Sequence, residues 1–337
     1  MKLISLSSIK IGEQLSFDLR GSTGTMLLRN KTVLMQNMVT RLKTLGFYAV
    51  YIDDDQYEDV EVRQAIPDEM KSSVLGSLQD LRPNLVRGRK DAVEPFKQMG
   101  QEILDEVRVS VLEPINMVST FAIDNPMFLH AINTAIVTAA ICVKSNVKPH
   151  LAENYVTAAL IHDFCLRDIA DDMADEFEHT TALYRLLKEA VTVDATCFMA
   201  AALHHEKFDG TGGPRRLSGT QIIEGARIIA VADLFDCVSF GYAGYPRLEA
   251  AQAVEYVSAN AGTMLDPDIV KVFAESVSIY PTGATVKLDN GLTAMVYRQN
   301  AGMPTRPVLR IVSPNPEERI EIDMLTNMTV FIEKVEL

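Results

Sequence analysis

The sequence lacks several features that define special classes of protein. Its longest apolar stretch, Ala131 to Val143, is shorter than a membrane span and contains Asn133 and Thr134. Its first eight residues have neither the sustained apolar core nor the small-residue cleavage site of a signal peptide. These absences predict a cytoplasmic protein without a membrane span.

Cysteine is scarce as well. The four cysteines are widely spaced and form neither a disulfide framework nor a CxxC metal motif. Cys142, Cys197 and Cys237 lie in apolar, helix-like stretches, so we expect them to be small core residues. Cys165 closely follows a His-Asp pair, so a position at a functional site is open for it.

Positive charge is in deficit. The chain has 32 Lys and Arg residues against 45 Asp and Glu residues, a net charge of −13. This balance excludes the broad basic surface on which long nucleic acids bind. A small anionic ligand is still allowed, because a metal centre and a few local arginines can outweigh distant charges that salt screens.

The hydrophobic pattern divides the 337 residues into four parts. Residues 1–65 mix short strands with a helix and predict a small α+β accessory or regulatory domain, and residues 66–99 predict a helical linker. Residues 100–277 alternate apolar helical runs with short polar breaks, which is typical of an all-α bundle. Residues 278–337 alternate like strands around a hairpin turn at Asn290-Gly291 and predict a small β appendage. The predicted fold is multidomain, with an all-α core between the two smaller parts.

One predicted helix bears on assembly. Apolar residues recur at helical spacing from Pro95 to Val118, with an interruption expected near Pro114. Such a face serves either a dimer interface or packing on its own domain, and both alternatives stay open here. Further helices are predicted at Asn37–Leu45, Thr180–Val191, Arg247–Ala261 and Asp266–Val277.

The strongest chemical signal is the stretch from His204 to Pro214. It contains two adjacent histidines with Glu206 and Asp209, and it closes with a Gly-Gly-Pro turn. The apolar run before it, from Cys197 to Leu203, reads as the end of a buried helix. Neutral imidazole is the commonest metal ligand, and carboxylates complete mixed sites for first-row metals. A polar loop with two adjacent histidines is the alternative for this stretch alone.

Other histidines and carboxylates in apolar surroundings favour a metal centre. Most lie inside or at the ends of apolar helix-like runs: His130, His162-Asp163, His179 and Asp233. Burying an ionised carboxylate is costly unless it is paired or bound to a metal. A structural salt bridge is the alternative for Asp233, but five histidines and two aspartates fit a shared metal centre better.

The order of these motifs resembles the HD-GYP family. The resemblance rests on His130, on His162-Asp163, on His179, on the stretch from His204 to Pro214 and on Ala232-Asp233, and it covers about residues 100–277. Members of this family are HD-superfamily phosphodiesterases that hydrolyse cyclic di-GMP. The first 65 residues and the β appendage are also similar to segments found beside HD-GYP modules.

The resemblance implies a set of site residues. The metal ligands are expected to be His130, His162, Asp163, His179, His204, His205 and Asp233, with Asp163 as the catalytic bridge between two ions. Mixed nitrogen and oxygen ligands without thiolate suit iron or manganese. Glu206 and Asp209 are expected to act as second-shell or loop-fixing groups. Gly210 and Gly212 are expected to let the backbone approach the ligand closely.

The chain departs from the family pattern at three places. Gly212-Gly213-Pro214 stands where the family has Gly-Tyr-Pro, so the tyrosine is absent. Cys165-Leu166 replaces a Gly-Lys pair whose lysine helps to bind phosphate. Three arginines are candidate replacements, each with simple exposure as its alternative: Arg167, Arg215 and Arg216. Pro126 stands where members with a third metal carry a glutamate, which predicts two divalent ions.

The leading functional hypothesis is a metal-dependent phosphodiesterase. It would hydrolyse cyclic di-GMP to linear pGpG, with GMP as a further product left open, through a metal-bridging hydroxide. A related cyclic dinucleotide as substrate and a homodimer or signalling-protein partner stay open. One alternative is a catalytically weak cyclic-dinucleotide sensor that retains the metal site, motivated by the altered Tyr and Lys positions. A general HD nucleotidase is the third hypothesis.

Overall fold

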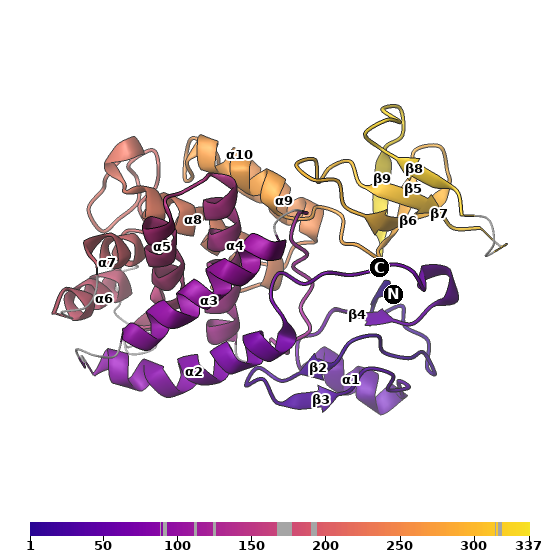
Figure 1. Ribbon diagram of the computed structural model, residues 1–337, viewed down its shortest axis with the longest axis horizontal. Helices are drawn as coiled ribbons and strands as arrows, with labels where there is room; N and C mark the ends of the chain where they lie inside the picture. Colours follow the sequence, from indigo (N-terminus) through magenta and orange to yellow (C-terminus); the bar gives the residue numbers. More distant parts are fainter. Residues whose placement is uncertain are drawn as a thin grey trace. The chain divides into compact units, whose positions relative to one another are not determined.

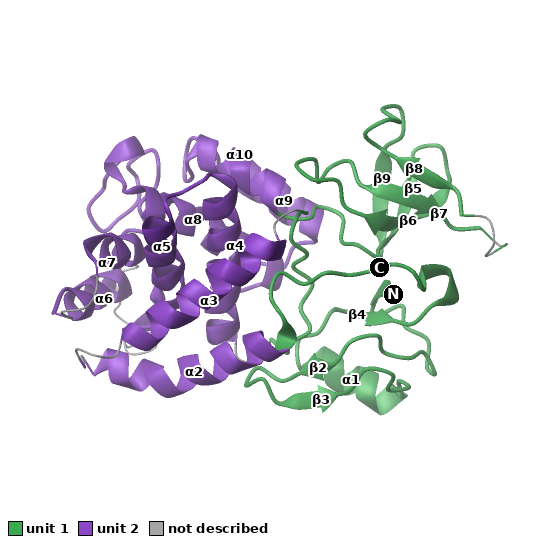
Figure 2. Cartoon of the chain, in the orientation of Figure 1, with its two compact units in different colours: residues 1–68, 112–125, 277–337 green, residues 69–111, 126–276 purple. Residues whose placement is uncertain are grey.

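The chain forms two compact units (Figure 2). The computed structural model describes residues 1–87, 89, 93–110, 113–123, 126–166, 177–189, 194–313, 315 and 319–337. A β-rich unit contains Met1–Asp68, Leu112–Asn125 and Val277–Leu337, and a helical unit contains Glu69–Val111 and Pro126–Ser276. The N-terminal and C-terminal segments therefore share a unit. The four-part division into domains stays a prediction.

The predicted fold class is confirmed. The described residues of the helical unit form helices and no named strand, and short strands flank the unit in the sequence on both sides (Figure 1). Its helices are α2 (Asp68–Val86), α3 (Glu94–Ser110), α4 (Pro126–Lys144), α5 (Pro149–Ile161), α6 (Glu178–Glu189), α7 (Ala195–Ala202), α8 (Glu224–Phe240), α9 (Ala250–Ala259) and α10 (Pro267–Ser276).

Helix α4 lies at the centre of the helical unit. Its residues are buried continuously from Met127 to Cys142, on every side of the helix. A helix that is apolar all round belongs to a core or to a membrane span, and α4 is long and apolar enough for either. Its most apolar window is 89% buried within the structure, which identifies a core helix. The cytoplasmic location stays a prediction.

Helix α3 packs on its own unit. Its apolar stripe, which includes Phe96, Ile103 and Val107, is buried against α4 and α5. This stripe is therefore not available as a dimer interface, and a homodimer stays a prediction. The helix predicted from Pro95 to Val118 is too long, because α3 ends at Ser110. Pro114 offers no backbone N–H and disfavours a helical residue before it.

The β-rich unit combines the two ends of the chain. The first 65 residues contain β1 (Lys2–Ser5), β2 (Leu19–Arg20), β3 (Met26–Leu28), α1 (Gln36–Thr44) and β4 (Ala49–Ile52). The C-terminal strands β5 (Thr285–Leu288), β6 (Thr293–Arg298), β7 (Val308–Ile311), β8 (Glu321–Asp323) and β9 (Ile332–Glu336) form an antiparallel sheet in the order β8-β7-β6-β5-β9. Leu3 and Tyr51 share one buried cluster with Val286 and Leu288. The C-terminal sheet thus completes a core that neither end has alone.

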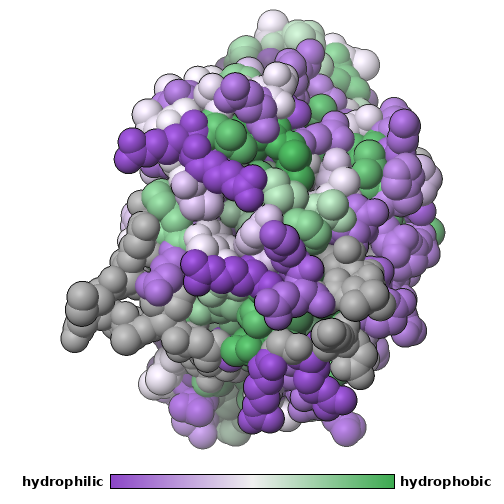
Figure 3. All heavy atoms as spheres, turned by 90° about the vertical axis from the view of Figure 1, so that its left-hand side faces the viewer, coloured by the Kyte–Doolittle hydropathy of each residue, from purple (hydrophilic) through white to green (hydrophobic). Residues whose placement is uncertain are grey.

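Hydrophobic and hydrophilic side chains are mixed on one face of the helical unit. In Figure 3, the described hydrophobic side chains on this face lie in small groups between hydrophilic ones. Scattered exposed apolar residues are normal for folded proteins. Burial around α4 is therefore the main source of hydrophobic stabilisation in this unit.

Candidate metal centre

The structure brings all seven predicted ligands together in the helical unit. His130 lies in the first turns of α4, and His162 and Asp163 follow the end of α5. His179 lies in the first turn of α6, His204 and His205 follow α7, and Asp233 lies within α8. Their potential ligand atoms form overlapping groups in which all atoms lie within 4.8 Å of one another. Five helices therefore supply side chains to one buried point.

Two histidines are oriented in the same way by the helices that precede them. The Nδ1 atom of His162 lies 2.7 Å from the carbonyl oxygen of Ala159, and Nδ1 of His204 lies 2.7 Å from that of Ala201. A carbonyl oxygen only accepts, so each Nδ1 carries the hydrogen and donates it. Both Nε2 atoms are then free to present a lone pair to the centre, as in metal-binding histidines.

A chain of buried polar groups orients His130. Its Nδ1 donates to Asp236 Oδ2 at 2.7 Å, and Asn133 Nδ2 donates to Asp236 Oδ1 at 2.8 Å. Lys71 Nζ in turn donates to Asn133 Oδ1 at 2.8 Å. A carboxylate behind a ligating imidazole fixes its tautomer and raises its basicity. The sequence analysis gave Asp236 no role.

The imidazole nitrogens face one another across the centre. Nε2 of His130 lies 3.1 Å from Nε2 of His162, and Nε2 of His205 lies 3.2 Å from Nε2 of His179. Nε2 of His204 is buried without a hydrogen-bond partner among the described residues. Lone pairs that converge in this way repel unless a cation lies among them. Ligands about 2.1 Å from one ion lie about 3.0–3.4 Å apart, which matches these separations.

Asp163 lies among four of the histidines. Oδ1 lies 3.4 Å from His179 Nε2 and 3.7 Å from the Nε2 atoms of both His162 and His204, whereas Oδ2 lies 3.8 Å from His130 Nε2. The second carboxylate, Asp233, has Oδ1 3.1 Å from His130 Nε2. Asp163 therefore belongs to a group with His179, His204 and His205 and also to a group with His130 and His162.

The charges at the centre are those of a cation site. Burial alone would lower the pKa of His130, but the carboxylates of Asp233 and Asp236 raise it to about 10. Burial would raise the pKa of Asp163 and of Asp233, but the surrounding histidines hold both well below the ordinary value. Burial and neighbouring imidazoles lower the pKa of His204 well below its ordinary value. The ionised carboxylates and neutral His204 are in the state that metal ligands need, whereas His130 is protonated at neutral pH and would lose that proton when an ion binds.

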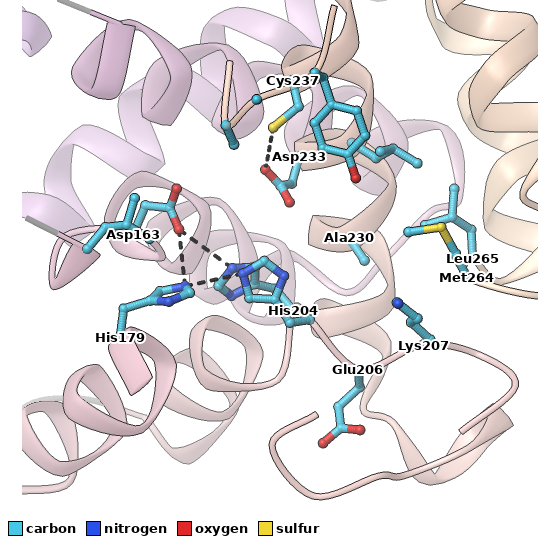
Figure 4. Close-up of a pocket in the computed structure, with 16 residues that line it drawn as sticks. Asp163, His179, His204, Glu206, Lys207, Ala230, Asp233, Cys237, Met264 and Leu265 are labelled. Atoms are coloured by element: carbon cyan, nitrogen blue, oxygen red, sulfur yellow. Dashed lines mark hydrogen bonds and ion pairs between the residues drawn. The ribbon is translucent and has the colours of Figure 1, made fainter. Parts of the chain in front are cut away.

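A cavity of about 440 Å³ opens onto this centre. Figure 4 shows Asp163, His179 and His204 on one side of it, with Asp233 and Cys237 across from them. Its remaining lining is mixed in chemistry: Leu166, His205, Glu206, Lys207, Ala230, Leu234, Ala243, Gly244, Tyr245, Met264 and Leu265. Lys207 and Cys237 line the cavity, but the sequence analysis did not predict either as a site residue. Cys165, the cysteine for which it left a site position open, is buried and is not among the residues that line this cavity.

The loop after the two histidines is fixed by its own carboxylates. Glu206 is buried and accepts backbone N–H bonds from Arg215 at 2.6 Å and from Leu217 at 2.8 Å. Asp209 is exposed and accepts from the backbone N–H and hydroxyl of Thr211. Both side chains therefore hold the loop. Their predicted role as loop-fixing groups agrees with these bonds.

The Gly-Gly-Pro turn is closely packed. A Cβ at position 212 would lie 2.3 Å from the backbone nitrogen of Lys207, and one at position 213 would lie 2.5 Å from the ring of Phe177. Gly213 also donates its N–H to the carbonyl of His205 at 3.2 Å, and the Gly213-Pro214 peptide is cis. Phe177 thus fills the space into which the family tyrosine would project.

The predicted phosphate-binding arginines are not found at the cavity. Arg215 is exposed and lies over the ring of Tyr184, 5.3 Å from its centroid. Arg216 is exposed too. Gly212, Gly213 and Pro214 are also absent from the described lining. Arg167 lies outside the described residues. A substrate contact by any of these residues stays a prediction.

Comparison with known proteins identifies the helical unit. The HD-domain family model matches residues 169–269. This part of the chain is therefore similar to an HD domain. A cyclic di-GMP phosphodiesterase of Pseudomonas aeruginosa is 26% identical over 62% of this chain and 54% of the relative. One of Thermotoga maritima is 27% identical over 58% of this chain and 55% of the relative. A 3′3′-cGAMP-specific phosphodiesterase of Vibrio cholerae is 29% identical over 37% of this chain and 29% of the relative.

These matches confirm the resemblance on which the sequence analysis relied. The HD domain covers the motifs from His179 to Asp233, and the matched relatives are phosphodiesterases of cyclic dinucleotides. The chain spans about half the length of the first of these relatives. The activity of the whole protein is therefore a matter for proposal.

Proposed function

We propose that this protein is a metal-dependent phosphodiesterase that hydrolyses cyclic di-GMP to linear pGpG. One observation carries the proposal: at least four imidazole nitrogens and both carboxylates converge on one buried centre, where metal ions would balance the carboxylate charges and bind the imidazole nitrogens. Divalent ions bound at such a centre supply the Lewis acidity and the activated water that phosphodiester hydrolysis needs. The names of the relatives add support for a cyclic dinucleotide as the substrate.

The grouping of the ligands supports two ions. Asp163 is shared by two groups of potential ligands, one with His179, His204 and His205 and one with His130 and His162. A carboxylate that belongs to both groups could be shared by a pair of ions. Pro126 begins α4 and offers no third carboxylate at that position. Iron and manganese both suit this mixture of imidazole and carboxylate.

Lys207 is the residue best placed to hold a phosphate. It lines the cavity, and its ammonium has no side-chain partner among the described residues (Figure 4). Leu166, at the position of the family lysine, lines the same cavity and contributes no charge. An ammonium beside a phosphate forms charge-assisted hydrogen bonds. Lys207 therefore compensates for Leu166 from the opposite side of the motif.

The apolar part of the lining suits the bases of a dinucleotide. Leu234, Met264 and Leu265 offer hydrophobic contacts, and Tyr245 offers a ring on which a base can stack. The same wall accepts other cyclic dinucleotides, and one relative is specific for 3′3′-cGAMP. The assay described below therefore shows whether the cavity prefers a dinucleotide with two guanine bases or one with guanine and adenine.

A catalytically weak sensor is the second candidate function. The packing of Phe177 against Gly213 and the uncharged Leu166 in the cavity lining both depart from the family pattern. A protein of this kind would bind a cyclic dinucleotide with its metals in place and release it unchanged.

The deciding experiment is a chromatographic assay with protein reconstituted anaerobically with Fe(II) or Mn(II). Cyclic di-GMP, 3′3′-cGAMP and 5′-mononucleotides are supplied separately, and binding is measured in parallel by calorimetry. We expect a linear dinucleotide from cyclic di-GMP. Binding without turnover by metal-loaded protein would favour the sensor, and release of inorganic phosphate from mononucleotides would favour a general nucleotidase.

A further inference from the structure

We propose that Cys237 supplies a sulfur ligand to a metal ion held with His130 and Asp233. This inference deepens the proposed function, because it rests on the same metal centre. It concerns a residue that neither the sequence motifs nor the HD-domain match includes as a ligand. Its consequence is a metal preference that differs from that of a centre with only nitrogen and oxygen ligands.

Helix α8 presents Asp233 and Cys237 on the same face. The two residues are four apart, so their side chains lie one helical turn from each other. The Sγ atom of Cys237 lies 3.4 Å from Oδ1 of Asp233, and Figure 4 shows the sulfur directed at this carboxylate. Both side chains line the cavity. The helix therefore delivers oxygen and sulfur to one place.

The separations match two ligands of a single ion. Zinc–sulfur bonds are about 2.3 Å and zinc–oxygen bonds about 2.1 Å, so sulfur and oxygen bound to one ion lie roughly 3.1–3.6 Å apart. The 3.4 Å between Cys237 Sγ and Asp233 Oδ1 falls in this interval, and His130 Nε2 lies 3.1 Å from the same oxygen. The potential ligand atoms of these three residues all lie within 4.8 Å of one another.

The other cysteines do not share this arrangement. Cys142 and Cys197 are buried within α4 and α7, and none of the three groups of potential metal ligands among the described residues includes them or Cys165. Cys237 differs because its neighbours on α8 and α4 are the proposed ligands Asp233 and His130. The Cys237 thiol donates a hydrogen bond to Asp233 Oδ1, and this bond would be replaced when the two atoms bind one ion.

A sulfur ligand changes which metal the centre prefers. Thiolate is a soft ligand that favours Zn²⁺, Fe²⁺ and Co²⁺, whereas Mn²⁺ prefers oxygen and nitrogen. When such an ion binds, the sulfur–metal bond forms and the thiol proton passes to the solvent. No oxidation state changes. The iron alternative of the sequence analysis is thus favoured over manganese at the ion beside Asp233.

The first test is spectroscopic and uses the metal alone. The full-length protein is freed of metal with a chelator and titrated anaerobically with Co²⁺. We expect a sulfur-to-cobalt charge-transfer band in the near ultraviolet. The band should be absent in Cys237→Ser and retained in Cys165→Ser, a nearly isosteric control at a buried cysteine that closely follows the His162-Asp163 pair.

The second test measures affinity. Cys237→Ser should weaken Zn²⁺ binding roughly 10–100-fold, as changes around a metal site commonly do, and should leave Mn²⁺ binding within about threefold of the wild type. Circular dichroism checks that each variant folds. An equal loss for both metals would overturn the proposal, because it would report a disturbed site instead of a lost sulfur.

The outcomes separate this inference from the proposed function. Cobalt bound without the charge-transfer band, or a band that survives in Cys237→Ser, would overturn the sulfur ligand and leave the metal-dependent function intact. Protein that binds no transition metal would overturn both. A band lost only in Cys165→Ser would reject Cys237 and assign the sulfur to Cys165.

Discussion

The Nε2 atoms of His130 and His162 lie 3.1 Å apart, although each ring already uses its Nδ1 atom as a donor, to Asp236 and to Ala159 respectively. Two lone pairs are thereby brought face to face in a buried place. A proton or a metal ion must lie between them, and His179 and His205 repeat the arrangement at 3.2 Å. The helical unit therefore brings together imidazole nitrogens that can share a proton or bind a metal ion.

The first prediction concerns Asp236, which holds His130 from behind. Replacing it with alanine removes the acceptor of His130 Nδ1–H and of Asn133, so the imidazole is free to turn. Metal affinity should fall roughly 10–100-fold, while activity at saturating metal is largely restored. Calorimetric titration with Mn²⁺ measures the change. Asp268→Ala, an exposed aspartate on α10, is the control, and equal affinity for both variants would contradict the role of Asp236.

The second prediction concerns Lys207. Its ammonium is expected to bind a substrate phosphate, so Lys207→Ala should raise the KM for the cyclic dinucleotide roughly tenfold or more, the worth of one charge-assisted hydrogen bond. Metal content should not change. Lys188→Ala, on exposed α6 surface, tests whether loss of any nearby charge has the same effect. An unchanged KM in Lys207→Ala would assign phosphate binding to another residue.

The third prediction concerns Phe177 and Gly213. Introducing the family tyrosine by Gly213→Tyr places its Cβ 2.5 Å from the Phe177 ring, so the side chain cannot be accepted without displacement. The free energy of unfolding should fall by about 1–3 kcal/mol, the usual cost of overpacking. Adding Phe177→Ala should recover part of this loss. Effects that simply add in the double variant, measured by urea unfolding, would show that the two positions do not compete for space.

The fourth prediction concerns pH and the β-rich unit. Arg310 donates to Asp59 at 2.6 Å and Arg319 at 2.8 Å, and these bonds hold the pKa of Asp59 below its ordinary value. The ionised carboxylate is therefore favoured by folding. Its contribution is complete above the ordinary aspartate pKa of about 4 and is lost as the pH falls below it.

Acid sensitivity of Asp59 is measured by urea unfolding at neutral pH and at about pH 3. The wild type should lose more stability between the two conditions than Asp59→Asn, which has no ionisable group there. Asp55→Asn, an exposed aspartate of the same segment, should behave like the wild type. The same loss in all three proteins would mean that the pairing with Arg310 and Arg319 has no net effect.

The sequence was a good guide to the histidines for a physical reason. His162 and His204 follow apolar helices, and their Nδ1 atoms bond to carbonyls three residues earlier in the chain. The residues next to each histidine in the sequence therefore determine both its position at the end of a helix and the orientation of its imidazole ring. Asp233 could be singled out because a carboxylate in an apolar helix needs a partner.

The sequence was a poor guide where partners are distant in the chain. Asp233, Asp236 and Cys237 share one apolar helix, and only packing against α4 shows that Asp236 supports His130 while Cys237 faces the cavity. The shared core of Leu3, Tyr51 and Val286 joins segments more than 200 residues apart, and no local pattern encodes such pairing. Phe177 and Gly213 are likewise far apart in the chain. The sequence therefore could not predict that the Phe177 ring packs where a tyrosine side chain at position 213 would lie.

The central claim is that a cation centre organised by Asp163 hydrolyses a cyclic dinucleotide. The most direct measurement compares cyclic di-GMP turnover by metal-free protein, by protein reconstituted anaerobically with Fe(II), and by equally treated Asp163→Ala and Asp268→Asn. Asp268 is an exposed carboxylate on α10 outside the predicted site, so its variant should keep full activity. The account predicts linear product from reconstituted wild type and Asp268→Asn, and at least about a 100-fold loss in the other two samples. Turnover by metal-free protein, or by Asp163→Ala at the wild-type rate, would contradict it.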